Sequence, residues 1–203
     1  MHHIYHTEGI ILGSRNFGEA GRYYYIFTRD LGLIHASAQG VRKMSSKLRF
    51  VLQDFTYIKI DLIAGKNIFR ITNASKTDKL ERITKRPDTF EVFTNIARLL
   101  KRLLAGIEPN EDLFVDLLKS LSILEKVAIK DGVIFNGKED LRNIEAIIVL
   151  RIVNNLGYIG GNEALRIFIK SPFEFEEDII FEAAKNRRTI LSEINKALRE
   201  THL

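Results

Sequence analysis

The stretch that decides the fold is residues 21–39, which read GRYYYIFTRDLGLIHASAQ. Its first half contains a run of aromatic and β-branched residues, 23–27, which is typical of a β-strand. Residues 30–32, Asp-Leu-Gly, then indicate a turn. From residue 34 to 39, apolar and polar residues alternate, which is the period of a strand with one buried face. This stretch therefore predicts two consecutive strands.

The flanking sequence predicts three more strands, at residues 10–12, 56–62 and 68–73, with turns at 16–19 and 64–67. Five short strands in about 70 residues form a sheet whose edges must be covered or closed. A five-stranded barrel of the oligonucleotide-binding (OB) type closes them. The longest interruption, residues 40–50, falls between the third and fourth strands, where such a barrel usually has its helix or long loop.

From residue 87 onward, apolar residues recur at steps of three and four, which predicts helices. Helices are predicted from 87 to about 104, from 110 to about 124, from 139 to 156 and from 186 to about 201. The third is apolar over much of its surface, so we expect it at the centre of a bundle. Residues 162–185 are also expected to be helical, with a break at Pro172. We predict an α+β protein, with an OB barrel at 1–80 and a helical bundle at 81–203.

The net positive charge of the chain comes entirely from its N-terminal part. Residues 1–80 contain 12 Lys and Arg against 6 Asp and Glu, a balance of +6. Residues 81–203 contain 19 against 20, a balance of −1. This asymmetry favours an anionic partner for the predicted barrel. On charge alone, a merely soluble basic domain is an equally good interpretation.

The densest group of cations lies in residues 40–49, GVRKMSSKLR, which contain no acid. Cations at this density can neutralise several phosphates, and each contact releases counterions. We predict the following DNA-binding residues, in this segment and on nearby strands and turns: Arg15, Arg22, Arg42, Lys43, Lys47, Arg49, Lys66 and Arg70. Aromatic residues lie among these cations, and those that face outward can stack on bases. The candidates for stacking are Phe17, Tyr23 and Tyr25; the alternative is that the tyrosines, Tyr24 and Tyr57 included, form the core and rim of the barrel.

Several function classes are disfavoured. The chain has no cysteine, which excludes disulfides, thiolate zinc sites and cysteine nucleophiles. It also has no G-x-x-x-x-G-K-[ST] motif, the phosphate-binding loop of ATPases. No apolar run approaches the ~20 residues that span a bilayer, and no signal peptide is expected at the N-terminus. His2, His3 and His6 are assigned to a mobile terminus. We therefore expect a cytoplasmic protein that is not an enzyme and needs no cofactor.

Motifs throughout the predicted barrel resemble the N-terminal domain of the bacterial DNA repair proteins of the RecO family. They are TEGIIL at 7–12, RNFGEAGR at 15–22, FTRDLGLI at 27–34, AQGVRK at 38–43 and SKLR at 46–49, followed by Leu52-Gln53 and Phe55. They occur in a consistent order within residues 5–76. The helical part resembles the family more weakly, in its layout and in Leu150-Arg151 and Leu156-Gly157-Tyr158.

The resemblance implies an OB domain followed by a helical domain. It also implies binding of single- and double-stranded DNA, annealing of complementary strands, and work with RecR, and often RecF, to load the recombinase at the nucleoid onto strands coated by single-strand-binding protein. On matching positions, the implied DNA contacts are Arg15, Arg22, Arg42, Lys43, Lys47 and Arg49. Many family members carry a four-cysteine zinc module after the central helix. Residues 158–163 lack cysteine and the chain is short for the family, so we expect no zinc.

Three alternatives remain open from the sequence. The first is a general single-strand or RNA-binding OB protein with an unrelated helical domain. The second is an assembly scaffold whose basic face meets an acidic protein, with the acidic tail of single-strand-binding protein as a candidate ligand of the helical domain. The third is a two-metal nuclease using acids within 174–178, although acids at the start of a helix have a simpler electrostatic role.

Overall fold

The computed structural model describes residues 3–104, 106–129, 137–170 and 177–201. The chain forms two compact units, and each is described here by itself. The first consists of residues 1–81 together with 97–114, and the second of 82–96 together with 115–203. In the described part of the chain, no helix combines the length and apolar character needed to cross a membrane.

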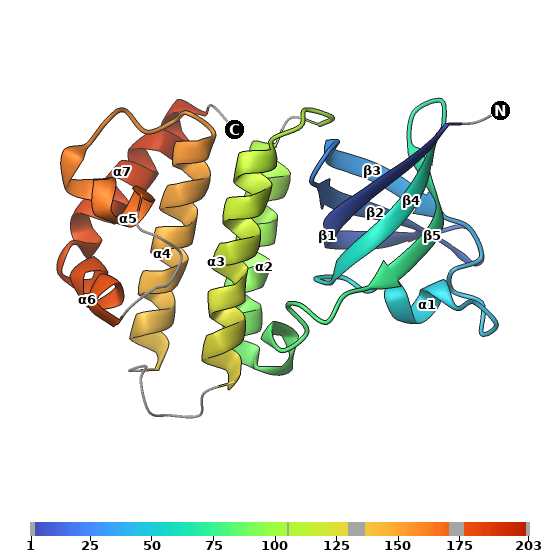
Figure 1. The fold of residues 1–203 in the computed structure, drawn as a ribbon, viewed down its shortest axis with the longest axis horizontal. Coiled ribbons are helices and arrows are strands. Elements are labelled where there is room, and N and C mark those ends of the chain that lie inside the picture. The colour runs from blue at the N-terminus through green and yellow to red at the C-terminus, as the bar shows by residue number, and fades with distance from the viewer. Residues whose placement is uncertain (1–2, 105, 130–136, 171–176, 202–203) are drawn as a thin grey trace. The chain divides into compact units, whose positions relative to one another are not determined.

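Five strands of the first unit form a closed barrel (Figure 1). They are β1 (Ile4–Phe17), β2 (Gly21–Thr28), β3 (Gly32–Ala38), β4 (Tyr57–Ala64) and β5 (Phe69–Lys76). Around the barrel they follow the order β1-β2-β3-β5-β4, and β1 also pairs with β4. All neighbours are antiparallel except β3 and β5, which pair in parallel. The predicted five-stranded OB barrel and its helical continuation are confirmed.

Strand β1 is much longer than residues 10–12, because it serves both of its neighbours. Its N-terminal half pairs with β4 and its C-terminal half with β2, and the register shifts between Ile11 and Gly13. Such a bulge bends a strand, which lets it continue around a small barrel. The assignment of His6 to a mobile terminus is wrong, because His6 lies within β1 and its Nδ1 hydrogen bonds to Asp61 Oδ1 at 2.6 Å.

A one-turn helix, α1 (Leu48–Val51), lies between β3 and β4, within the predicted interruption. The barrel core is built from inward-facing apolar residues of all five strands, and Leu48 and Val51 pack against it. Leu52, which follows α1, is fully buried. The interruption is therefore anchored to the barrel at its C-terminal end.

The first unit also includes the connection between α2 (Pro87–Leu103) and α3 (Glu111–Ile129). The Leu33 amide donates a hydrogen bond to the Gly106 carbonyl at 3.1 Å. At Gly32, where φ is +70°, a Cβ would come within 2.3 Å of the Glu108 carbonyl oxygen. Glycine is therefore required at the start of β3, both for its conformation and for this close approach.

The second unit contains α4 (Lys138–Asn155), α5 (Arg166–Lys170), α6 (Glu177–Lys185) and α7 (Arg187–Glu200). Both α4 and α7 lie within one residue of the predicted bounds, whereas α3 extends five residues beyond its predicted end. Side chains of α4 such as Ile147 and Leu150 form a core with residues of α5, α6 and α7, as its apolar surface predicted. The predicted break at Pro172 lies outside the described residues.

Candidate nucleic-acid interface

The three consecutive tyrosines of β2 divide between the two faces of the barrel wall. Tyr24 points into the core and is fully buried, whereas Tyr23 and Tyr25 are partly exposed. Successive side chains of a strand point to opposite faces, so Tyr23 and Tyr25 share the outer face. In register, Tyr23 lies opposite Arg15 of β1 on one side and Ser37 of β3 on the other.

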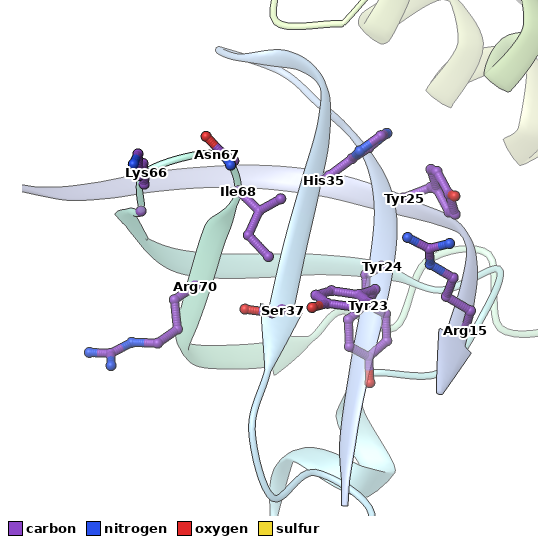
Figure 2. A pocket seen from close by; sticks show the side chains of 11 residues that line it. Arg15, Tyr23, Tyr24, Tyr25, His35, Ser37, Lys66, Asn67, Ile68 and Arg70 are labelled. Atoms are coloured by element: carbon purple, nitrogen blue, oxygen red, sulfur yellow. The ribbon is translucent and has the colours of Figure 1, made fainter. Parts of the chain in front are cut away.

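This outer face carries a hollow of about 520 Å³ (Figure 2). Ser37 pairs in turn with Arg70 of β5, so one row of residues crosses four neighbouring strands from Arg15 to Arg70. Lys66, in the β4–β5 turn, also lines the hollow. OB barrels bind oligonucleotides on the face of their second and third strands, with help from the loops that follow the first and fourth strands. The hollow therefore occupies the usual ligand site of this fold.

Tyr23 belongs to a small aromatic cluster at one side of the hollow. Its ring stacks on Phe17, with centroids 4.1 Å apart and planes 18° apart. The Arg15 guanidinium carbon is 5.4 Å from the Tyr23 centroid, a cation–π distance. At Gly21, a Cβ would come within 2.4 Å of the Phe17 ring, so only glycine leaves room for this stack. The cluster presents an ordered aromatic platform with a cation beside it.

Tyr25 has two neighbours that the sequence analysis did not single out as site residues. His35, its partner on β3, contacts it edge-on with centroids 4.8 Å apart. Lys101, from the C-terminal half of α2, places its Nζ 5.7 Å from the Tyr25 centroid. The alternation in β3 could have identified His35 as outward-facing. No sequence signal identifies Lys101, because only the packing of residues 97–114 against the barrel brings it there.

The segment 40–49, called the basic loop below, is fixed to the turn between β1 and β2. The Arg42 amide donates to the Ala20 carbonyl at 3.0 Å, and its guanidinium donates to the Gly18 carbonyl at 3.5 Å. Arg42, Lys43 and Lys47 are exposed. Because Phe17 immediately precedes this turn, the basic loop adjoins the aromatic end of the hollow.

The eight predicted cations fall into two groups and one exception. Arg15, Lys66 and Arg70 line the hollow, whereas Arg42, Lys43, Lys47 and Arg49 belong to the basic loop. Arg22 lies on the Tyr24 side of β2, where its Nε donates to Asn16 Oδ1 at 3.1 Å. Burial raises the pKa of Tyr24 to about 12, and the Arg22 charge partly opposes this shift. Arg22 therefore neither lines the hollow nor belongs to the basic loop.

None of these eight cations forms an ion pair with another described residue. Two other barrel cations are paired: Arg29 with Glu111 at 3.1 Å, and Lys76 with Glu81 at 2.9 Å. A cation without an acidic neighbour keeps its full charge for an external anion. The hollow and the basic loop are thus the surfaces of the barrel best suited to phosphate.

Two other tyrosines named as alternatives belong to the core. The Tyr24 hydroxyl donates to the Leu52 carbonyl at 3.4 Å. Tyr57 is nearly buried and its hydroxyl donates to the Glu8 carboxylate; burial, followed by this hydrogen bond, raises its pKa. Neither ring is available to a base, so the interpretation of the tyrosines as core residues is correct for these two.

A metal-dependent site finds no support in the described ranges, where no group of three or more His, Cys, Asp or Glu could hold an ion. Of the acids considered for a nuclease, Glu174 and Glu176 lie outside the described residues. Asp178 lies in the first turn of α6, where a negative charge favours the helix dipole.

Comparison with known proteins identifies the barrel. Residues 1–79 match the family described as Recombination protein O N terminal. The DNA repair protein RecO of Heliobacterium modesticaldum is 31% identical over 155 residues, which cover 76% of this chain and 52% of the relative.

Two further relatives named DNA repair protein RecO agree with this match. The protein of Rubrobacter xylanophilus is 30% identical over 76% of this chain and 58% of its own length. The protein of Desulfitobacterium hafniense (strain DSM 10664 / DCB-2) is 28% identical over 76% of this chain and 52% of its own length. The chain thus spans about half the length of the curated relatives it matches. Residues 1–79 match the N-terminal domain of RecO, and about three quarters of the chain is similar to proteins named DNA repair protein RecO.

Proposed function

We propose that this protein binds DNA on the outer face of β2 and β3 and on the basic loop, and that it acts as a recombination mediator in DNA repair. One observation carries the proposal. Tyr23 and Tyr25 are partly exposed at the usual ligand site of an OB barrel, among cations that have no acidic partner in the described chain.

The hollow suits a single strand. Bases would stack on Tyr23 and Tyr25, and each stacked base contributes about 1–3 kcal/mol. Phosphates would meet Arg15 at one side and Lys66 and Arg70 at the other, since these cations flank the aromatic rings. Lys101 would extend the path beyond Tyr25. Stacking tolerates any base, so we expect little sequence preference.

The basic loop suits a second strand or a duplex. Its four cations have no acid among residues 40–49. Two DNA strands repel each other, and a protein that neutralises phosphates on both lowers the electrostatic cost of bringing them together. We propose that a single strand held in the hollow and a second backbone held by the basic loop are annealed in this way.

The similarity to RecO proteins supports a set of partners that the chain itself does not identify. We propose that it works with RecR, and with RecF where that protein is present, to help load the recombinase at the nucleoid in the cytoplasm. The acidic tail of single-strand-binding protein is the proposed ligand of the helical unit. A pull-down with RecR and with single-strand-binding protein from the same genome tests both; retention of neither removes this part of the proposal.

The DNA-binding part is tested by fluorescence anisotropy with a labelled single-stranded oligonucleotide. The double variant Arg15→Ala/Arg70→Ala should lose about 10-fold or more in affinity, with a smaller salt dependence, because two phosphate contacts disappear. The matched control is Arg29→Ala/Lys76→Ala, which removes two barrel cations that already have acidic partners. Equal losses in the two variants would show that general charge, rather than this hollow, binds DNA.

Three further measurements separate the alternatives. A mediator should anneal complementary strands. It should also prefer DNA when single-stranded DNA, duplex DNA and RNA compete for binding. A preference for RNA would favour the general OB protein. Binding of an acidic protein without DNA binding would favour a scaffold. Cleavage of DNA that depends on a divalent cation would favour the nuclease.

A further inference from the structure

Two large apolar side chains are exposed in the most basic part of the molecule. Met44, in the middle of the basic loop, is 83% exposed, and Phe50, just after it, is 62% exposed. The exposed part of these side chains gains no free energy from burial, so packing of the fold does not account for it. Their neighbours Lys43, Lys47 and Arg49 are all cations.

The geometry of α1 explains why Phe50 faces outward. Leu48 and Val51 pack against the barrel core, and Leu52 is buried. These positions are spaced by three and four residues, so they share one side of a helical turn. Phe50 lies on the opposite side, on a turn anchored to the barrel. The ring is therefore presented by a fixed element.

Arg49 joins the two exposed side chains. Its Nη1 donates to Met44 Sδ at 2.8 Å, and its guanidinium carbon is 5.2 Å from the Phe50 centroid. The three side chains form one compact group, with a cation in contact with a thioether and an aromatic ring. We call Met44 and Phe50 the apolar wedge.

We propose that the apolar wedge inserts between bases of the nucleic acid held by the basic loop. The inference rests on the proposed DNA binding and adds a base-contacting site outside the hollow. Each nucleotide combines a flat base with an anionic phosphate, which matches an exposed ring beside a guanidinium. Met and Phe are among the side chains that proteins insert between base steps.

Charge favours nucleic acid as the occupant. Arg42, Lys43 and Lys47 belong to the same loop as Met44 and are close to it in the sequence, whereas the acids Glu19 and Asp54 lie in the β1–β2 turn and after α1. The hydrogen bonds from Arg42 to the β1–β2 turn make the basic loop continuous with the aromatic end of the hollow. An inserted wedge unstacks the bases on either side of it. It would thereby present them for pairing with a complementary strand.

The helical unit offers a matched control in Phe181 of α6. Its side chain is also 62% exposed, and Lys185 Nζ lies 4.3 Å from its ring centroid. Its surroundings differ, because Asp178 and Glu182 are close in the sequence of the same helix. The two phenylalanines therefore share exposure and a cationic neighbour but differ in the charge around them.

The first test uses the absence of tryptophan from this sequence. Phe50→Trp and Phe181→Trp each introduce a single tryptophan whose fluorescence reports on stacking. Single-stranded DNA should quench the tryptophan at position 50 and leave that at 181 unchanged. Bound DNA, detected by anisotropy, with no quenching at 50 would overturn the wedge while leaving DNA binding in place. A response at 50 to anionic phospholipid vesicles, but not to DNA, would also overturn it.

The second test measures affinity. Phe50→Ala should weaken binding to single-stranded DNA about 5- to 140-fold, the range that corresponds to the loss of one stacked base. The salt dependence should stay the same, because no charge is removed. Phe50→Trp should retain the affinity, whereas Phe181→Ala should have no effect. An unchanged affinity in Phe50→Ala, with normal binding by the unmodified protein, would contradict the inference. Absence of DNA binding by the unmodified protein would instead contradict the proposed function.

Discussion

The two parts of the chain differ in their balance of charge and in what surrounds their cations. In the barrel, all eight predicted DNA-binding cations lack an acidic partner among the described residues. In the helical unit, some cations pair with nearby acids, Arg166 with Glu163 at 2.8 Å and Lys185 with Glu182 at 2.6 Å, whereas others, such as Arg188 and Lys196, form no ion pair with a described residue. Residues 81–203 contain more Lys and Arg than residues 1–80, 19 against 12, yet they carry no net positive charge.

This difference shows that charge count alone does not locate a nucleic-acid site. What marks the barrel is that its cations outnumber its acids and that several of them lie beside partly exposed aromatic rings. In residues 81–203 the 19 cations are balanced by 20 acids, so the summed field of this part is weak.

The largest effect should come from the basic loop. Changing Arg42, Lys43, Lys47 and Arg49 together to alanine removes four phosphate contacts. Affinity for single-stranded DNA should fall roughly 100-fold near physiological salt, and the slope of log K against log salt should shrink by about 3. Anisotropy titrations at several salt concentrations measure both, and an annealing assay should show a parallel loss.

A matched control removes four cations from the helical unit. Four exposed cations there, Lys170, Arg188, Lys196 and Arg199, can be changed to alanine in the same way. This variant should bind DNA as the unmodified protein does. If it loses as much affinity as the basic-loop variant, the contrast between the two parts is wrong.

The next effect should separate the faces of β2. Tyr23→Ala and Tyr25→Ala should each cost about 1–3 kcal/mol of DNA-binding free energy, with small changes in melting temperature. Tyr24→Ala should instead lower the free energy of unfolding by about 3–5 kcal/mol, because a buried ring is removed. Thermal denaturation and anisotropy on the same samples distinguish the two outcomes. Equal loss of stability in all three variants would mean that Tyr23 and Tyr25 are structural.

A smaller effect should come from Lys101. Lys101→Ala should weaken DNA binding about 4-fold and reduce the salt slope by about 0.7, the values expected for one phosphate contact. Lys126→Ala, an exposed cation on α3, is the control and should change neither value. A normal salt slope in Lys101→Ala would exclude α2 from the site.

The smallest effect concerns stability and pH. Burial raises the pKa of Glu145, whose Oε1 accepts a hydrogen bond from Asn95 at 2.9 Å. Since the pKa of this carboxyl is higher in the folded protein than in the unfolded chain, the free energy of unfolding falls as pH rises from the unfolded-state pKa to the folded-state pKa. Glu145→Gln keeps an acceptor and removes the buried charge, so it should raise the melting temperature at neutral pH and have little effect in acid.

Asp61 in the barrel should behave in the opposite way. Hydrogen bonds from His6 and then Asn73 lower its pKa, so its contribution is present above the unfolded pKa and is lost as pH falls through the lowered value. Asp61→Asn should therefore lower the melting temperature at neutral pH and converge with the unmodified protein in acid. If the differences in melting temperature between each variant and the unmodified protein had the same sign at neutral pH for Asp61→Asn and Glu145→Gln, these pKa directions would be wrong.

The strands, the interruption at 40–50 and the central helix were predictable because each follows from a local period. The length of β1 was not, since its pairing with both β2 and β4 depends on a bulge at Ile11 and Gly13. The run of three tyrosines shows that β2 has two faces, but its sequence does not say which face is buried. Only the register with β1 and β3 assigns Tyr23 and Tyr25 to the outside.

The candidate site was predictable in part. The cations of the basic loop were visible as a cluster in the sequence, whereas the row from Arg15 to Arg70 required the barrel to close. Lys101 required tertiary packing from a segment outside the barrel. Phe50 had a local signal in the spacing of Leu48, Val51 and Leu52, which leaves it on the opposite side of the turn.

The outer face of β2 and β3 is the proposed binding site of the DNA strand. The most direct measurement is photo-cross-linking to single-stranded DNA that contains bromodeoxyuridine, followed by mass spectrometry of the modified peptides. The adducts should fall on peptides that contain Tyr23, Tyr25 or His35, and they should disappear in the presence of unlabelled single strands. Adducts confined to residues 115–203 would contradict the account.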